Sequence, residues 1–415
     1  MKILFITYFF APYNCIGAVR TTRTVEKLIE MGHDVCVITA NDQHLMKNLS
    51  SEVPETKIIR TRWVDLEKPI YSFLGRNNVL SLKNNVHKKS FKSILLNFLN
   101  GIFQRVISIP DKHIGWYFHA VNESKKTINA GWVPDVIFAS ATPYTSLMIA
   151  KNISKYFGIP WVGELRDLWA DNHYGYGWWV DKKIEKLTLK TASALVTVSN
   201  PLNEILQKKY PKIKVSTILN AYDKKDFLNE YEIKSNSKFN IVYTGAIYSG
   251  KRDPSPLFEA LNLQKSLQNF LNIDFYGNDL GYVYSLIEKY NLHDCVKVHG
   301  SVSRDEALQY QKKSSVLLLL TWDNPNEKGV LTGKLFEYIG SSKPILSIGA
   351  IEDTASTLIK ENNFGVATNT PEEIVQFLQS IISNDFKIDI NNRKKFERTK
   401  QVSKLEEVLY EAIKP

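Results

Sequence analysis

Short apolar runs alternate with longer stretches in which apolar residues recur every three or four positions, over almost the whole 415-residue chain. Continuous apolar runs are typical of strands buried on both faces of a parallel sheet, and the three-to-four spacing is typical of amphipathic helices. The alternation of the two predicts an α/β protein with doubly wound parallel sheets. In the first half, the predicted strands are KILFITYFF, DVCVITA, VPDVIFAS, IPWVGEL and ASALVTVS.

The first of these runs, Ile3 to Phe10, also resembles the apolar core of a signal peptide. It ends at Ala11-Pro12 without a small-x-small cleavage site, so we favour a buried strand. No apolar run approaches the roughly 18 to 20 residues needed to span a bilayer. The sequence therefore predicts a protein that is not integral to a membrane.

The strand and helix pattern begins again in the second half of the chain. Ser303 and Glu306 have the spacing of a capping box at the start of a helix. Two Rossmann-like halves are expected to meet near Asn220, with domains at 1–215 and 216–400 and a final helical segment at 401–415 that could pack back on the first domain. The predicted strands of this half are FNIVYTGAI, IDFYGND, CVKVHGSV and SVLLLLTW.

The segment from Gly329 to Leu346, GVLTGKLFEYIGSSKPIL, predicts an anion site. A helix start offers unpaired N–H groups and a positive dipole end, so Thr332, Gly333 and Lys334 are expected to cradle a diphosphate. Glu337 follows Lys334 by three residues on the same helical face, where its carboxylate could accept hydrogen bonds from ribose hydroxyls. Alternatively, KLFEYI is simply an amphipathic helix packed on a sheet.

The formal net charge of +10 indicates attraction to polyanions, which include nucleic acids, anionic lipid surfaces and phosphorylated small molecules. Three widely spaced cysteines predict neither a disulfide framework nor a zinc site, and they fit a reducing cytosol. No helix-turn-helix, RRM or zinc-finger pattern supports a nucleic-acid-binding protein.

Seven segments, in this order, resemble GT-B glycosyltransferases, and specifically the retaining glycosyltransferase family 4. The resemblance implies two Rossmann-like domains that face each other across a cleft, the first for the acceptor and the second for a nucleotide-sugar donor. The segments are the loop at Gly17, ASALVTVSNPLNEIL, ILNAYDKKDF, IVYTGAIYSGKRDP, IDFYGND, VKVHGSVSRDEALQYQKKSSVLLLL and GKLFEYIGSSKPIL.

The resemblance also implies roles for individual residues. Gly17 is expected to approach the donor diphosphate through its backbone, Lys251 or Arg252 to neutralise it, and Glu337 to hold the ribose. Gly245 is a further donor-binding candidate. Three positions depart from the family pattern: Ala221 replaces a glycine, Ala246 replaces an arginine, and Gly329 replaces a glutamate that contacts the donor sugar. Glu327 could substitute for that missing glutamate.

A second candidate segment is ELRDLWADNHYGYGWW. Arg166 stands at about the position of a family histidine and Asp167 follows it, so either residue could touch the donor sugar or the acceptor, with Glu164 and His173 as further candidates. The alternative is an exposed ion pair that contributes little. Aromatic residues of the segment could form a stacking wall for a sugar, a membrane-interface patch or a packed lid: Trp169, Tyr174, Tyr176, Trp178 and Trp179. Of these, Tyr174, Trp178 and Trp179 are the candidates for acceptor binding.

Apolar residues between Phe91 and Ile107 fall on one helical stripe, with lysines such as Lys88 and Lys92 beside it. A core helix is the more common explanation for such a stripe, and the alternative is a membrane-surface helix that meets a lipid-linked acceptor.

The sequence thus predicts a cytosolic enzyme. If the stripe from Phe91 to Ile107 is a membrane-surface helix, the enzyme would be peripheral to the inner membrane face. It would transfer a sugar from a nucleotide diphosphate sugar to a glycan or polyprenyl-diphosphate acceptor in bacterial surface polysaccharide synthesis. No Asp-x-Asp metal motif stands at a strand end, so this interpretation requires no metal, and no cofactor is expected. The family resemblance implies retention, and in such enzymes the leaving diphosphate takes the acceptor's proton, so no dedicated base is expected. The alternatives are another GT-B activity, such as a sugar-nucleotide epimerase, and a basic nucleic-acid-binding protein. The donor sugar, the base, the acceptor and the linkage stay open.

Overall fold

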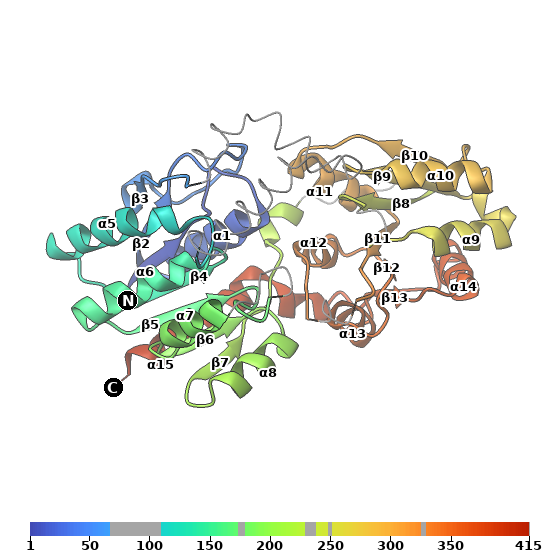
Figure 1. Ribbon diagram of the computed structural model, residues 1–415. Coiled ribbons are helices and arrows are strands. Elements are labelled where there is room, and N and C mark those ends of the chain that lie inside the picture. The colour runs from blue at the N-terminus through green and yellow to red at the C-terminus, as the bar shows by residue number, and fades with distance from the viewer. Residues whose placement is uncertain (67–108, 173–178, 229–237, 248–250, 325–328, 415) are drawn as a thin grey trace, which may run out of the picture. The chain divides into compact units, whose positions relative to one another are not determined.

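The computed structural model describes residues 1–66, 109–172, 179–228, 238–247, 251–324 and 329–414 (Figure 1). Their contacts divide the chain into two compact units. Unit 1 comprises Met1–Ile218 and Val402–Pro415, and unit 2 comprises Leu219–Gln401. The predicted stripe from Phe91 to Ile107 lies outside the described residues.

Unit 1 contains a seven-stranded parallel sheet in the order β3-β2-β1-β4-β5-β6-β7. Its strands are β1 (Lys2–Thr7), β2 (Asp34–Ala40), β3 (Ile58–Thr61), β4 (Val136–Ala141), β5 (Trp161–Leu165), β6 (Ala194–Thr197) and β7 (Lys214–Thr217). The helices are α1 (Ile16–Glu30), α5 (Tyr117–Asn129), α6 (Thr145–Phe157), α7 (Trp179–Leu189), α8 (Asn200–Lys209) and α15 (Arg398–Ile413), which enters unit 1 at Val402.

Both faces of this sheet are buried. Alternate residues of β1 belong to different apolar clusters: Leu4 and Ile6 pack in the cluster that includes α5 and α6, and Ile3 and Phe5 pack in the cluster that includes α1 and α15. All four side chains are fully buried. Because side chains alternate between the faces of a strand, a continuous apolar run is required for a sheet covered on both sides.

Unit 2 contains a six-stranded parallel sheet in the order β10-β9-β8-β11-β12-β13. Its strands are β8 (Phe239–Thr244), β9 (Leu271–Tyr276), β10 (Val296–His299), β11 (Val316–Leu320), β12 (Ile345–Ile348) and β13 (Gly365–Ala367). The helices are α9 (Ser255–Leu263), α10 (Gly281–Tyr290), α11 (Arg304–Lys313), α12 (Gly333–Ser341), α13 (Thr354–Glu361) and α14 (Pro371–Ile382).

Each strand order runs outward in one direction and then reverses, as in a doubly wound Rossmann sheet. The reversal lies between β1 and β4 in unit 1 and between β8 and β11 in unit 2. Ligands of open α/β sheets bind beyond the carboxyl ends of the strands at such switch points. The two sheets therefore define one candidate edge in each unit.

Most of the predicted elements are confirmed, including the strand after Met1 and the helix and strand within Gly329–Leu346. The capping box is also confirmed, since Ser303 Oγ accepts from the Glu306 N–H and Glu306 Oε2 accepts from the Ser303 N–H at 2.8 Å. One detail differs: α1 begins at Ile16, so Gly17 lies in its first turn rather than in the preceding loop.

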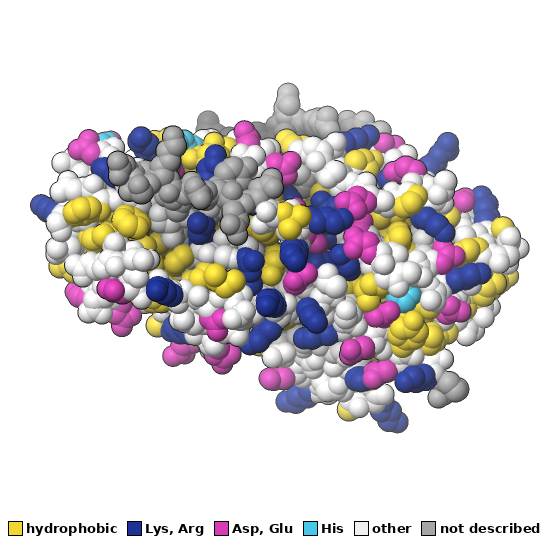
Figure 2. Space-filling view, turned by 180° about the vertical axis from the view of Figure 1, so that it is seen from behind, with side chains coloured by type: hydrophobic (Ala, Val, Ile, Leu, Met, Phe, Trp, Pro, Cys, Tyr) yellow, Lys and Arg dark blue, Asp and Glu magenta, His cyan; other side chains and the backbone are white. Residues whose placement is uncertain are grey.

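On the face drawn in Figure 2, Lys and Arg side chains are mixed with Asp and Glu. Of the helices in the described part of the chain, none has the length and apolar content needed to cross a bilayer.

Candidate functional site

The predicted anion cradle lies at the start of α12, which follows β11 along the chain. Thr332 is the N-cap residue of α12, and its side chain makes no capping hydrogen bond to the first turn. Gly245 comes directly after β8 with φ +139°, a conformation that favours glycine. A Cβ at Gly245 would collide with the Lys334 ammonium, so the absence of a side chain lets the lysine lie against this backbone. The two predicted residues are thus brought together at the β8 switch point.

Lys334 is held in surroundings that disfavour its charge. Its Nζ lies 4.3 Å from the ring centroid of Tyr243, which is fully buried. Burial, with the nearby charge of Arg252, lowers the pKa of Lys334 to about 7 despite the opposing effect of Glu337. Among the described residues, no carboxylate forms an ion pair with this ammonium group. A bound anion would supply the negative charge that is missing.

The two candidate cations for the diphosphate differ in their surroundings. Arg252 is half-buried, donates from Nη1 to the Ala246 carbonyl at 3.1 Å, and affects the pKa of Lys334. Lys251 is exposed, and its Nζ lies 4.5 Å from the ring centroid of Trp322. Arg252 is therefore the cation whose charge reaches the Lys334 ammonium.

Glu337 lies one turn beyond Lys334 on α12 and is contacted by α11, which packs beside α12. Arg304 Nε is 3.5 Å from Glu337 Oε1, and Gln311 donates to Glu337 Oε2 at 3.4 Å. Burial raises the pKa of Glu337, while Arg304 and Gln311 oppose the shift. With 29% of its side chain exposed, the carboxylate is supported from the protein side and open to a further hydrogen-bond donor.

Arg304 joins this carboxylate to a second acidic residue. Its Nη2 lies 2.7 Å from Asp226 Oδ2, which belongs to the short 3₁₀ helix Lys224–Phe227. Gln311 also donates to Thr244 Oγ1 at 3.0 Å, at the end of β8. Hydrogen bonds and ion pairs thus connect the end of β8, α11 and α12 in one polar network.

In unit 1, the first turn of α1 lies against Arg166. A Cβ at Gly17 would stand 2.9 Å from Arg166 Nη1, so only glycine permits this approach without displacement of the guanidinium. Arg166 donates from Nε to the Ala141 carbonyl and from Nη2 to the Thr142 carbonyl, both at 2.8 Å. Cys15, the N-cap residue of α1, makes no side-chain cap. A cation and a helix N-terminus thus meet beyond β4 and β5.

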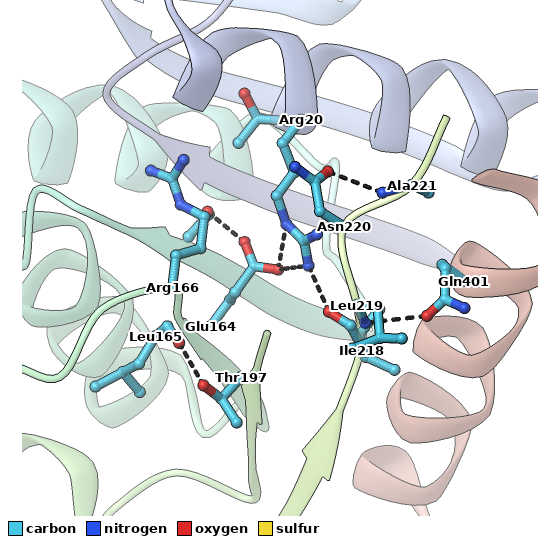
Figure 3. A network of polar contacts seen from close by, with 12 residues as sticks. Arg20, Glu164, Leu165, Arg166, Thr197, Ile218, Leu219, Asn220, Ala221 and Gln401 are labelled. Atoms are coloured by element: carbon cyan, nitrogen blue, oxygen red, sulfur yellow. Dashed lines mark hydrogen bonds and ion pairs between the residues drawn. The ribbon is translucent and has the colours of Figure 1, made fainter. Parts of the chain in front are cut away.

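A buried ion pair lies next to Arg166 (Figure 3). Arg20 of α1 donates from Nε and Nη2 to Glu164 Oε1 at 3.1 and 2.7 Å, and Ser140 donates to Glu164 Oε2 at 2.5 Å. Burial alone would raise the pKa of Glu164, but Arg20, Arg166 and Ser140 outweigh it and hold the pKa below its usual value. Arg20 Nη2 also donates to the Ile218 carbonyl at 3.0 Å. Glu164 therefore positions α1 rather than facing a ligand.

The remaining predicted residues are scattered. Asp167 is exposed, Trp179 begins α7 with 65% of its surface exposed, and Gly329 is buried. Trp169 is buried and stacks on Tyr144 at 5.0 Å, so it belongs to the core rather than to a sugar-stacking wall. The other candidates lie outside the described residues: His173, Tyr174, Tyr176, Trp178 and Glu327.

Sequence reasoning missed Arg304 and a cluster around His113. Arg304 stands beside the predicted capping box, but it reaches Glu337 only through the packing of two helices. His113 follows an unremarkable loop, and its neighbours Tyr8 and Trp63 come from two other loops. No local pattern signals either arrangement.

Two Rossmann-like units, each with a doubly wound parallel sheet, are typical of the GT-B fold. No protein-family model and no curated protein matches the sequence. Among solved structures, HepE from Anabaena in complex with UDP is similar over 99% of this chain and 100% of its own, at 13% identity and a TM-score of 0.61.

Two further structures share this fold. The lipopolysaccharide outer core galactosyltransferase WaaB is similar over 99% of both chains, at 14% identity and a TM-score of 0.58. A putative UDP-N-acetylglucosamine 2-epimerase from Listeria monocytogenes is similar over 98% of this chain and 94% of its own, at 10% identity and a TM-score of 0.55. At such identities the likeness establishes the fold, and the function rests on the site.

Proposed function

We propose that this protein is a retaining glycosyltransferase that moves a sugar from a nucleotide diphosphate sugar to a hydroxyl of a glycan or lipid-linked acceptor in bacterial surface polysaccharide synthesis. The observation that carries the proposal is Lys334, a lysine with a strongly lowered pKa, at a helix start on the β8 switch point of unit 2. A desolvated cation without a carboxylate partner among the described residues is suited to a diphosphate.

The chemistry of transfer requires stabilisation of the leaving diphosphate. As the bond from the sugar to the diphosphate breaks, negative charge grows on the leaving oxygen. Lys334, Arg252 and the α12 N-terminus would stabilise that charge through preorganised contacts, with Lys251 as a further cation. In a retaining reaction the same diphosphate accepts the proton of the attacking hydroxyl, so the protein needs no separate base and no cofactor.

Three further roles follow from the geometry of each unit. Glu337 would accept hydrogen bonds from the ribose hydroxyls, because its carboxylate is partly exposed and supported by Arg304. Arg166, with Gly17 beside it, would bind a negatively charged or hydroxyl-rich part of the donor. Thr332, Gly333 and Gly245 would contribute backbone groups to the diphosphate.

A lipid-linked acceptor would bring the protein to the inner face of the cell membrane, where the stripe from Phe91 to Ile107 and its lysines would lie on anionic lipid. Liposome co-sedimentation of the wild type against Phe98→Asp plus Phe103→Asp, with and without anionic lipid, tests this part. We expect binding that needs anionic lipid and fades with salt. If the wild type does not bind the liposomes, the stripe is better explained as a helix packed in the protein core.

The function itself is tested in two steps. Thermal stabilisation by UDP, ADP, GDP, CDP and dTDP identifies the nucleotide, with a single-stranded oligonucleotide as the control for general polyanion binding. The matching nucleotide sugars are then incubated with the enzyme, and the release of nucleoside diphosphate is measured. Stabilisation by the oligonucleotide but by none of the five nucleotides would overturn the proposal.

An epimerase is the second candidate, because a putative epimerase shares the fold. Such an enzyme changes the sugar and needs no acceptor. Conversion of the nucleotide sugar to its epimer, in the absence of any glycan, would favour that function, whereas slow hydrolysis to free sugar and nucleoside diphosphate favours a transferase.

A further inference from the structure

Unit 1 contains an aromatic cluster beyond the carboxyl ends of β1 and β3, formed by Tyr8, Phe9, Trp63, His113 and Trp116. Tyr8 follows the last residue of β1, and Trp63 lies two residues beyond β3. The His113 ring is central: its centroid is 4.2 Å from that of Tyr8, 5.8 Å from that of Phe9 and 6.1 Å from that of Trp63. The cluster therefore lies at the edge of the sheet where ligands of this fold class bind.

Part of this cluster is ordinary core. Tyr8 and Trp116 are almost fully buried, and Trp116 Nε1 donates to Thr61 Oγ1 at 2.6 Å. The Tyr8 ring contacts the rings of His113, Trp63 and Trp116, with 5.5 Å between the Tyr8 and Trp116 centroids. Packing alone accounts for them.

The polar atoms of His113 are not accounted for by packing. Its Nδ1 is buried and faces Asp111 Oδ1 at 3.6 Å, which is within range of an ion pair but too long for a hydrogen bond. Asp111 is instead occupied by the N–H groups of Thr145 and His113 and by the Thr145 hydroxyl, at 2.9 to 3.0 Å. The other ring nitrogen, Nε2, makes no hydrogen bond to a described residue, and 14% of the His113 side chain is exposed, so Nε2 is the atom through which this ring can meet a ligand.

The cluster also has an accessible side. Trp63 is only half-buried, its Nε1 donates to the Asp42 carbonyl at 3.2 Å, and the centroid of the exposed His44 ring lies 6.0 Å from that of Trp63. Val64, the next residue, is 50% exposed. The site thus offers a flat apolar ring and an imidazole with unused hydrogen-bonding capacity. That combination suits a pyranose, which has an apolar C–H face and hydroxyl groups at its edge.

We propose that Trp63 and His113 bind a pyranose ring of the acceptor, with the C–H face of the sugar on Trp63 and one hydroxyl hydrogen-bonded to the His113 ring. This inference rests on the proposed function and names the acceptor class: the group that unit 1 recognises is a sugar rather than a bare lipid phosphate. His113 here is a binding residue, since the proton of the reacting hydroxyl leaves with the diphosphate.

Saturation-transfer NMR with four probes, the methyl glycosides of glucose, galactose, mannose and N-acetylglucosamine, tests this inference on the full chain. The variants are Trp63→Leu, which removes the flat ring, and His113→Phe, which keeps the ring packing and removes both nitrogens. Phe118→Leu is the matched control, because Phe118 is an aromatic residue of the same unit that is 74% exposed. Thermal stabilisation by the nucleoside diphosphate is measured on the same samples.

We expect at least one glycoside to bind the wild type and Phe118→Leu, and its signal to fall at least fivefold in both site variants, while stabilisation by the nucleotide stays unchanged. The proposal is overturned if the wild type binds none of the four glycosides, or if both variants keep more than half the signal. If Trp63→Leu fails to fold, His113→Phe and His113→Gln decide the matter. If the nucleotide does not stabilise the wild type, the proposed function is contradicted. The glycoside signals of the wild type and the variants still decide whether Trp63 and His113 bind a sugar.

Discussion

The lowered pKa of Lys334 predicts how donor binding depends on pH. In the free protein its pKa is lowered to about 7, so the ammonium is about half protonated at neutral pH. A bound diphosphate places negative charge beside Nζ and raises the pKa, so binding takes up a proton whenever the pH lies above the free value. Affinity should therefore fall as the pH rises above 7.

The size of the fall follows from the protonated fraction of the free lysine. That fraction is roughly one half at pH 7 and roughly one hundredth at pH 9, so the affinity should drop about 50-fold between these values if the bound lysine stays protonated. Ionisation of the nucleotide contributes little to the pH dependence of the affinity between pH 7 and 9, because the last pKa of its terminal phosphate lies near 6. At pH 8, binding should take up about 0.9 proton.

Calorimetric titration with the nucleoside diphosphate at pH 7, 8 and 9, in buffers of different ionisation enthalpy, measures both quantities. Lys334→Arg is the matched control, since arginine keeps its charge throughout this range and its affinity should change less than threefold. Lys334→Met should bind weakly at every pH. A wild-type affinity that is constant from pH 7 to 9, or an equal slope in Lys334→Arg, would refute the reasoning.

Three further predictions concern other groups of the two units. Glu337→Ala should weaken nucleotide binding by about 1.5 to 3 kcal/mol and leave the fold intact, and calorimetry with a ribonucleotide and its 2′-deoxy counterpart should give similar affinities for the variant if the ribose role is right. Replacing Lys251 and Arg252 together with Ala should lower turnover more than any other pair of surface cations, with Arg252→Ala alone causing most of the loss in steady-state kinetics. Glu164→Gln should destabilise unit 1 by about 3 kcal/mol in chemical unfolding, because it leaves the Arg20 guanidinium buried without its carboxylate. Since the folded pKa of Glu164 is lowered, this stabilisation should be present above the ordinary glutamate pKa and be lost as the pH falls below it, and an equal acid sensitivity of Glu164→Gln and wild type would contradict the assignment.

The parts of the fold that the sequence predicts are those with strong local patterns. Continuous apolar runs identify β1, β8 and β11, and the helix start at Gly333 is marked by its small residues. The short edge strands β3, β7 and β13 escaped prediction, because three or four residues carry little periodic signal, although the equally short edge strand β10 was predicted.

The site divides in the same way. Gly245 and Lys334 were both candidates from their own segments, but their contact depends on the position of β8 beside β11. The pairing of Arg304 with Glu337 and the environment of His113 arise only when separate helices and loops pack, so no spacing along the chain encodes them. The sequence shows which residues can bind an anion or a hydroxyl group. It does not show which side chains from distant segments contact one another, because those contacts form only in the packed structure.

The division of the chain has a consequence for its synthesis on the ribosome. Unit 2 is a single continuous piece, Leu219–Gln401, inserted between the two segments that make unit 1. The helix α15 supplies Val402, Leu405, Val408 and Leu409 to the face of the unit 1 sheet that α1 also covers, so part of that face is uncovered while the whole of unit 2 is made. At about 5 to 20 residues per second, the roughly 180 residues of unit 2 keep it uncovered for some 10 to 40 seconds. Unit 1 is thus the first unit whose synthesis begins and the last to be completed. A nascent chain that stalls before Val402 would leave part of an apolar sheet face exposed to other chains.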